Sequence, residues 1–134
     1  MRIRNEVDLE ILRKAAWEDG KRVWLPKVDG KQMEFHFFGP ESRLEEGAYG
    51  ILEPEAGQVL VPGEATLVVM PGAVFSKSHD RIGYGGGYYD RDLSEHPQCR
   101  TMAVCHDLQI VDDLPAEEHD IRPDAIVSEE QILL

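Results

Sequence analysis

The sequence has few cysteines and no long apolar run. Its 2 cysteines are Cys99 and Cys105. Their spacing and the lack of ligand partners favour free thiols in a reducing cytosol over a disulfide or a zinc site. No segment approaches the ~18 apolar residues that a membrane helix requires, and the N-terminus lacks the apolar stretch of a signal peptide. We therefore expect a cytoplasmic protein that does not enter a membrane.

Positive charge is also scarce. The chain carries 14 Lys and Arg against 26 Asp and Glu, which gives a formal net charge of -12. This balance argues against a general nucleic-acid binder, because such proteins need clustered cations. To bind an anionic ligand, such a negatively charged protein would need a local cluster of cations and N–H groups. With 134 residues and 42% hydrophobic content, we expect one domain over residues 1–134.

The segment 81–91 provides such a cluster. Its glycines, at positions 83, 85, 86 and 87, leave backbone N–H groups free to approach phosphate oxygens. Arg81 and Arg91 flank the glycines and could pair with phosphate. Asp90 could hold Mg²⁺, and Tyr88 and Tyr89 offer flat faces to a ring. The segment predicts a nucleotide phosphate site, although glycine runs also form plain turns or hairpin tips.

The pattern of the chain predicts alternating helices and strands, and hence an α/β fold with a largely parallel sheet. Residues 31–38 alternate, with His36 on the face opposite Met33, and Pro26 is expected to close the strand before them. Residues 41–47 are expected to form a polar connection or short helix, 49–61 a loop, and 128–131 a last helical turn. We predict a first helix that Asp8 caps, that runs to about residue 19 and that Gly20 ends, a second helix at 88–93, and strands at 23–25, 31–38, 67–70, 101–105 and 125–127.

The glycine-tyrosine segment resembles the signature of the 5-formyltetrahydrofolate cyclo-ligase family, also called methenyltetrahydrofolate synthetase. The resemblance covers nearly the whole chain and includes a Pro-Gly pair and Phe75 ahead of Arg81. Further stretches occur in the family's order: Asn5-Glu6-Val7-Asp8, Gly20-Lys21-Arg22-Val23, Met33-Glu34-Phe35, Gly50-Ile51-Leu52-Glu53-Pro54, Asp107-x-Gln109 and Leu114-Pro115-x-Glu117-x-His119-Asp120.

The resemblance implies a three-layer Rossmann-like domain of the NagB/RpiA/CoA-transferase-like type. It also implies ATP- and Mg²⁺-dependent cyclisation of 5-formyltetrahydrofolate to 5,10-methenyltetrahydrofolate, with release of ADP and phosphate. Relative to the family, the chain is expected to lack an N-terminal segment that contributes basic residues to ATP binding. The alternative is a non-catalytic nucleotide- or folate-binding paralogue with a regulatory role. A homodimer that covers an exposed sheet edge is also expected.

Family positions imply the roles of the site residues. Arg81, Tyr88 and Asp90 are the implied catalytic residues. The residues implied to bind ATP are Arg81, Gly83, Tyr84, Gly85, Gly86, Gly87, Tyr88 and Tyr89. For Tyr88 and Tyr89, core packing is an alternative role. Two departures stand out, because Ser76 replaces the usual aspartate after Phe75, and Gly86 occupies a position where some members carry lysine.

The implied Mg²⁺ ligands are Asp90 and Asp124. Asp90 could instead interact with a helix dipole, and Asp124 could serve as a cap or turn residue. The residues implied to contact folate are Glu6, Met33, Tyr49 and Tyr88. Glu6 could also be a plain surface residue and Met33 a core residue. The five histidines show no ligand spacing, so we expect surface or loop positions for them.

Overall fold

The computed structural model describes residues 7–47, 52–55, 57–83, 87–115 and 121–134. The chain divides into two compact units, Met1–Val61 and Pro62–Leu134. The expectation of one domain over residues 1–134 stays a prediction.

The first unit begins with helix α1, which spans Glu10–Glu18 and agrees with the predicted helix. The carboxylate of Asp8 accepts a hydrogen bond from the N–H of Glu10 at 3.0 Å, so it satisfies one of the free donors at the helix start. At the other end, Gly20 adopts a φ of 76°, as expected of a glycine that ends a helix. The indole N–H of Trp17 donates to the carbonyl of Phe38 at 3.1 Å and so anchors the helix within this unit.

Strands β1 (Trp24–Asp29) and β2 (Gln32–Phe37) form an antiparallel hairpin. Gly30 occupies its turn with a φ of 62°. The prediction that Pro26 closes the first strand was wrong, because Pro26 lies inside β1 opposite Phe35. In this two-stranded sheet β1 is an edge strand, and an edge tolerates proline because the missing N–H has no ladder partner to lose.

The predicted alternation of β2 holds only in part. Met33 is buried as expected, but His36 on the opposite face is also buried, whereas Phe37 is 39% exposed. The expectation that His36 lies at the surface was therefore wrong. Its backbone forms an isolated antiparallel bridge with Val59, and its Nδ1 accepts a hydrogen bond from the N–H of Gly57 at 3.0 Å. The segment around Val59 thus pairs with the edge of β2, and its neighbour Gly57 contacts the His36 side chain.

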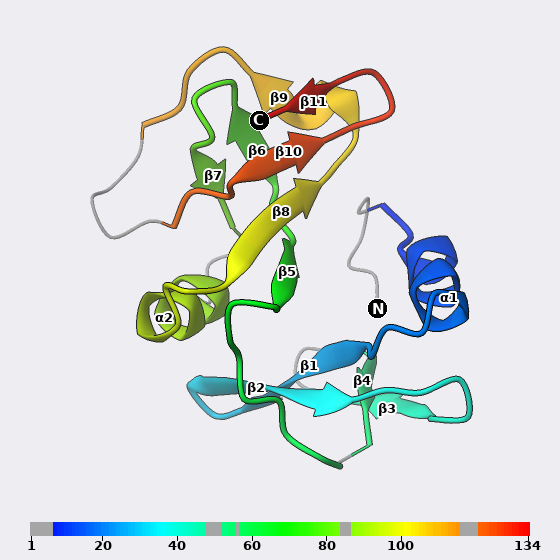
Figure 1. Cartoon of the computed structure of the whole chain (residues 1–134). Helices are drawn as coiled ribbons and strands as arrows, with labels where there is room; N and C mark the ends of the chain where they lie inside the picture. The colour runs from blue at the N-terminus through cyan, green and yellow to red at the C-terminus, as the bar shows by residue number, and fades with distance from the viewer. Residues whose placement is uncertain (1–6, 48–51, 56, 84–86, 116–120) are drawn as a thin grey trace. The chain divides into compact units, whose positions relative to one another are not determined.

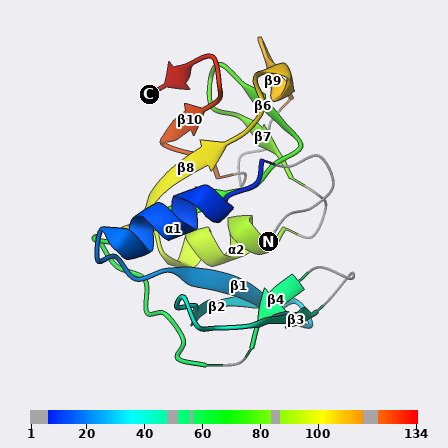
Figure 2. The ribbon, with the colours of Figure 1, turned by 90° about the vertical axis from the view of Figure 1, so that its right-hand side faces the viewer.

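A second hairpin joins β3 (Leu44–Glu46) and β4 (Leu52–Pro54). A strand therefore replaces the connection or short helix expected over 41–47, and part of the expected loop over 49–61 is also a strand. Figure 2 shows β4 alongside β1. The buried carboxylate of Glu53 explains this contact, because it accepts the N–H of Val28 on β1 at 2.7 Å. Long-range contacts of this kind are absent from local sequence patterns.

The second unit contains a four-stranded sheet in the order β11-β10-β8-β5. In Figure 1, β8 (Arg100–Val104) lies between β5 (Leu67–Met70) and β10 (Ala125–Val127). Both neighbours pair with β8 in parallel, which confirms the prediction of a largely parallel sheet. Only β11 (Ile132–Leu133) runs antiparallel to its neighbour.

A three-stranded sheet in the order β7-β6-β9 lies against these strands. It consists of β6 (Val74–Ser76), β7 (Arg81–Ile82) and β9 (Ile110–Val111). No sequence pattern predicted these two- and three-residue strands. Phe75 on β6 is fully buried and forms a core cluster with Ala103, Cys105 and Ile126, so the cluster joins the two sheets of this unit.

Helix α2 (Tyr88–Glu95) confirms the helix expected after the glycines. A 3-10 helix, η2 (Asp107–Gln109), follows β8. The final helical turn predicted over 128–131 was wrong. The hydroxyl of Ser128 does accept the N–H groups of Glu130 and Gln131, both at 3.2 Å, but the chain then enters β11 instead of a helix. Neither described α-helix is long and apolar enough to cross a membrane.

Candidate functional site

The glycine-tyrosine segment connects β7 to α2 in the second unit. Gly87 precedes α2 in the left-handed conformation, with a φ of 66°, which favours glycine at this position. Its carbonyl accepts the N–H of Arg91 at 3.0 Å and so begins the helical hydrogen-bond pattern. Tyr84, Gly85 and Gly86 lie outside the described residues, and their predicted ATP contacts stay predictions.

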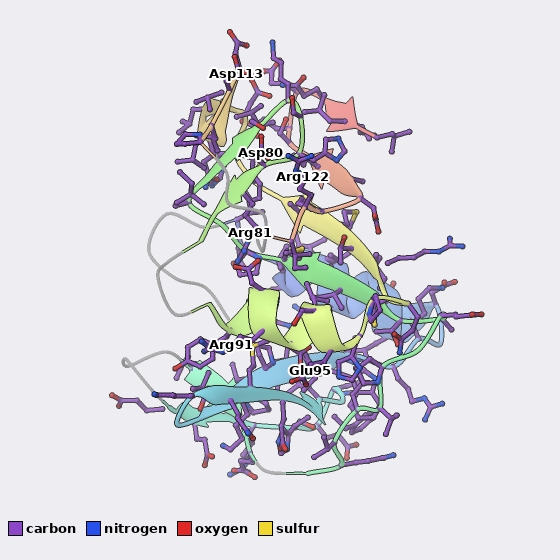
Figure 3. All side chains as sticks on the ribbon, turned by 90° about the vertical axis from the view of Figure 1, so that its left-hand side faces the viewer. Asp80, Arg81, Arg91, Glu95, Asp113 and Arg122 are labelled. Atoms are coloured by element: carbon purple, nitrogen blue, oxygen red, sulfur yellow. The ribbon has the colours of Figure 1, made fainter. Side chains whose placement is uncertain are left out.

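Arg81 lies on β7 and is 8% exposed. Its Nε donates a hydrogen bond to the carbonyl oxygen of Pro71 at 2.6 Å. One terminal nitrogen, Nη1, lies 3.4 Å from Oδ1 of Asp90 on α2. Figure 3 labels Arg81 beside the ribbon of α2. Because a backbone carbonyl and a carboxylate both constrain the guanidinium, its position and orientation are fixed before any ligand binds.

Gly83 lies against the same guanidinium. A methyl group added at Gly83 would come within 3.0 Å of Nη2 and 3.4 Å of Cζ of Arg81. The absent side chain therefore leaves room for Arg81 beside the backbone of the glycine segment. Thus two of the predicted phosphate-binding residues, Arg81 and Gly83, lie in contact distance of each other.

Asp90 connects three segments of the second unit. Besides its contact with Arg81, its Oδ1 accepts the N–H of Ile121 at 3.0 Å. It also lies in the first turn of α2, where a negative charge is favourable. The helix-dipole alternative is therefore compatible with the structure, and so is a metal-binding role for a carboxylate beside the predicted phosphate site.

The aromatic residues of the segment pack against arginines. The guanidinium carbon of Arg81 lies 5.8 Å from the ring centroid of Tyr89, and that of Arg91 lies 5.2 Å from the ring of Tyr88. Both distances are in the range of cation–π contacts. Each arginine predicted to face phosphate is therefore also adjacent to a tyrosine predicted to contact a ligand.

Asp124, the second predicted metal ligand, ties β8 to the start of β10. Its Oδ2 accepts the N–H of Thr101 at 2.9 Å, and its own N–H lies 2.9 Å from Oγ1 of Thr101. These bonds match the alternative role as a turn or cap residue. Among the residues that the structure describes, no group of three or more His, Cys, Asp or Glu side chains could hold a metal ion.

The predicted folate residues belong to the first unit, apart from Tyr88. Met33 is 9% exposed on β2, opposite Val28, which agrees with its alternative role in the core. Glu6 and Tyr49 lie outside the described residues. Their folate contacts stay predictions.

Sequence analysis missed a second group of charged residues near Arg81. Asp80 is buried, and its Oδ2 accepts the hydroxyl of Ser76 at 3.1 Å. The Nε of Arg122 lies 3.0 Å from Oδ1 of Asp80, and Figure 3 shows these two labelled side chains close together. The distance makes an ion pair, but Oδ1 has no aligned hydrogen-bond donor in the part of the chain that is described. The only sequence signal was Ser76 in the place of the family's aspartate.

Comparison with known proteins identifies the family. The model of the 5-formyltetrahydrofolate cyclo-ligase family matches residues 1–129. The chain belongs to this family. A 5-formyltetrahydrofolate cyclo-ligase from Escherichia coli (strain K12) is 32% identical over 134 residues, which cover 95% of this chain and 74% of that protein. The Mus musculus cyclo-ligase is 28% identical, with 96% of this chain and 70% of that protein covered.

Solved structures confirm the predicted α/β fold class of this cyclo-ligase family member. The NMR structure of Aquifex aeolicus 5,10-methenyltetrahydrofolate synthetase matches with a TM-score of 0.82 and 32% identity, over 98% of this chain and 67% of that chain. A 5,10-methenyltetrahydrofolate synthetase from Mycoplasma pneumoniae shares the fold, with a TM-score of 0.74 and 22% identity over 97% of this chain and 70% of that chain. The named relatives are enzymes of the ligase class.

Proposed function

We propose that this chain catalyses the ATP- and Mg²⁺-dependent cyclisation of 5-formyltetrahydrofolate to 5,10-methenyltetrahydrofolate, with release of ADP and phosphate. The family match over residues 1–129 supports this activity. The observation that carries the proposal from the family to this chain is the constrained guanidinium of Arg81, held by Pro71 and Asp90 beside the glycine segment.

The proposed reaction has two bond-forming steps on the folate. The formyl oxygen attacks the γ-phosphorus of ATP, the bond to the β-phosphate oxygen breaks, and ADP leaves. The neighbouring nitrogen of the folate then attacks the phosphorylated formyl carbon, and phosphate departs with the oxygen. No protein nucleophile is required, so the protein's contribution is alignment of the two substrates and stabilisation of charge.

Arg81 is suited to the charge-stabilising role. The Arg81 side chain is 6% exposed, and a charge in such a water-poor position acts more strongly on a phosphate than an exposed one. Tyr88 and Tyr89, the neighbouring rings, are proposed to contact the ligands, with Tyr88 facing both ATP and folate. The N–H groups of Gly83 and Gly87 are proposed to contribute to the phosphate site together with Tyr84, Gly85 and Gly86.

Mg²⁺ fits the donor chemistry of Asp90 and Asp124. Mg²⁺ in nucleotide sites is usually held by one or two carboxylates together with substrate phosphates and water, so a cluster of three protein ligands is not needed. When bound, Mg²⁺ would neutralise phosphate charge during transfer. The protein's role would be to hold the two carboxylates in place. The backbone N–H of Ile121 does this for Asp90, and that of Thr101 does it for Asp124.

The test of the ATP site measures methenyltetrahydrofolate formation from 5-formyltetrahydrofolate with MgATP. Arg81→Ala removes the constrained cation and is expected to lower kcat/KM for ATP by about 100-fold or more. Arg100→Ala is the matched control, because Arg100 is an exposed arginine of the same unit. If Arg81→Ala turns over as fast as wild type, the assignment of Arg81 to the ATP site is contradicted. If the wild type is folded but has no turnover, the proposed activity is contradicted.

Asp90→Asn tests the metal role while it keeps the hydrogen bond to Ile121, although it also removes the charge that faces Arg81. The asparagine oxygen can still accept the N–H of Ile121, but the negative charge is lost. We expect the Mg²⁺ concentration for half-maximal activity to rise by about tenfold. Asp112→Asn is the control, since the Asp112 side chain is 85% exposed. An unchanged Mg²⁺ requirement in Asp90→Asn would remove Asp90 from the metal site.

The folate contacts of Glu6, Met33 and Tyr49 are part of the same proposal. Met33→Ala, compared with wild type, is expected to raise the KM for folate without a matching change for ATP. A cytoplasmic location and a homodimer stay predictions from the sequence. Light scattering over a concentration series tests the homodimer, and a constant monomer mass would refute it.

A further inference from the structure

Gln109 makes three hydrogen bonds with one side-chain amide. Its Nε2 donates to the carbonyl oxygens of Gly72 and Ala73, both at 3.1 Å. Its Oε1 accepts the N–H of His106 at 2.8 Å. The amide thereby joins η2 to the turn 71–73 between β5 and β6, far away in the sequence. Both Nε2 hydrogens and one lone pair of Oε1 are used.

The turn 71–73 is also the segment that orients Arg81. The carbonyl of Pro71, directly before Gly72, accepts the Nε of Arg81 at 2.6 Å. The N–H of Ala73 donates to the carbonyl of Ile82, the residue after Arg81, at 2.8 Å. A shift of the turn would therefore move the acceptor of the Arg81 guanidinium and the backbone beside it.

We propose that Gln109 is a positioning residue of the ATP site, which sets the direction of Arg81 by fixing the turn 71–73. This inference rests on the proposed function for its effect on catalysis, but the link from Gln109 to Arg81 is geometric. Glutamine suits the position because two carbonyls face one donor group. Glutamate of the same shape would place negative charge against both carbonyls, and asparagine is one methylene shorter.

The other end of the link is also fixed. Oδ1 of Asp107 in η2 accepts the hydroxyl of Ser128 and the Nε2 of Gln131, both at 2.8 Å. Hence η2 is anchored to the turn between β10 and β11, and Gln109 extends from this fixed element. Gln131 provides a matched control, because it is also a partly buried glutamine, its Nε2 bonds Asp107 and not the turn 71–73, and the hydroxyl of Ser128 still holds Asp107 when Gln131 is replaced.

The first measurement follows solvent exchange of the Arg81 Nε–H by NMR, without ligands. In Gln109→Leu and Gln109→Glu we expect this exchange to be about tenfold faster than in wild type, which corresponds to loss of one typical hydrogen bond. In Gln131→Leu we expect the wild-type rate. If folded Gln109 variants keep the wild-type rate, the link is refuted, whatever the activity of the protein.

The second measurement compares steady-state constants. Gln109→Leu and Gln109→Glu are expected to raise the KM for ATP or lower kcat by about tenfold, with the KM for folate unchanged, whereas Gln131→Leu keeps all three values. The positioning role would be refuted if the Gln109 variants changed the KM for ATP and the KM for folate equally. It would also be refuted if they changed no constant while Arg81→Ala lowered the activity. Failure of both Gln109 variants to fold, while Gln131→Leu folds, would refute it as well. A wild type without turnover refutes the proposed activity, and the exchange measurement then decides the link alone.

Discussion

Gly72 is predicted to be intolerant of a side chain because of the Phe75 ring. A methyl group at Gly72 would lie 2.5, 3.0 and 3.2 Å from three ring carbons of Phe75. Unstrained carbon atoms approach to roughly 3.5–4.0 Å, so the ring or the turn would have to move by about 1 Å. Phe75 is 0% exposed and packs in the core cluster with Ala103 and Ile126, which leaves little room for the ring.

The expected cost of Gly72→Ala follows from two opposing terms. Overpacking of a filled core costs about 1–3 kcal/mol. Replacing glycine by alanine returns about 0.4–1 kcal/mol through the lower entropy of the unfolded chain. The overpacking term is larger, and we expect the free energy of unfolding to fall by about 1–2 kcal/mol.

A double-mutant cycle with Phe75→Leu isolates the contact. Phe75→Leu alone removes part of a buried ring and is expected to cost about 1–2 kcal/mol. With leucine at position 75, the methyl group of Gly72→Ala no longer meets a ring. The double mutant should therefore lose about 1 kcal/mol less stability than the two single mutants lose together. Urea unfolding of the four proteins gives the required free energies.

Gly63→Ala is the control for the glycine substitution itself. A methyl group at Gly63 meets no atom within 4 Å, so this variant should be as stable as wild type or slightly more stable. Equal stability of Gly72→Ala and Gly63→Ala would refute the steric reasoning. Additive costs in the cycle would show that the Phe75 ring is not the obstacle.

Three further predictions concern Asp80 and Cys105, two buried ionisable groups of the second unit. Arg122→Leu leaves the buried carboxylate of Asp80 without its cation. Because the Arg122 side chain is 63% exposed, we expect the free energy of unfolding in urea to fall by only about 1 kcal/mol. Adding Asp80→Asn should restore the lost stability, and a double mutant that stays destabilised would refute the pairing. Burial raises the pKa of the Cys105 thiol to about 11, so at pH 8 about one thiol in a thousand is ionised and alkylation of the native protein should be far slower than in denaturant. Equally fast alkylation of the native and the denatured protein would contradict the burial of this thiol. As the pH rises, the thiol of the unfolded chain loses its proton before the buried one does, so the free energy of unfolding should fall between pH 9 and 11.

The sequence features that predicted structure correctly were those that act locally. The apolar run before Pro71 formed a strand, β5, as predicted, although only Val68 and Met70 of it are buried and Leu67 is 54% exposed, and Gly20 ended α1 in a left-handed conformation. These signals depend on the type of a few neighbouring residues or on the φ of a single residue. Such information is contained in a short stretch of sequence.

The incorrect predictions involve partners that are distant in the chain. Pro26 was expected to end a strand, but an edge position made it harmless. His36 was expected at the surface, but it is buried and the segment around Val59 pairs with it. β6 is three residues long and pairs with β7 and β9, which have two residues each. Local propensity cannot specify such short strands, because their stability comes from pairing and packing.

The candidate site shows the same division. The glycines, Arg81 and Asp90 could be recognised because they lie within one segment. Gln109 was noticed only within the motif Asp107-x-Gln109, and its contact with the turn 71–73 spans 36 residues to Ala73. Asp80 and Arg122 showed no spacing that would pair them. The residues proposed to bind ligands lie in one segment and were predictable, and those that hold them in place were not.

Backbone groups hold each charged residue of the second-unit site. Arg81 donates to the carbonyl of Pro71, Asp90 accepts the N–H of Ile121, and Asp124 accepts the N–H of Thr101. Substitution of any of these residues by alanine therefore removes a charge and a structural bond together, and a loss of activity alone does not separate the two effects. Asp90→Asn retains the acceptor for Ile121 and removes a charge that also faces Arg81 at 3.4 Å, so its Mg²⁺ requirement reports metal binding more directly than its overall activity does.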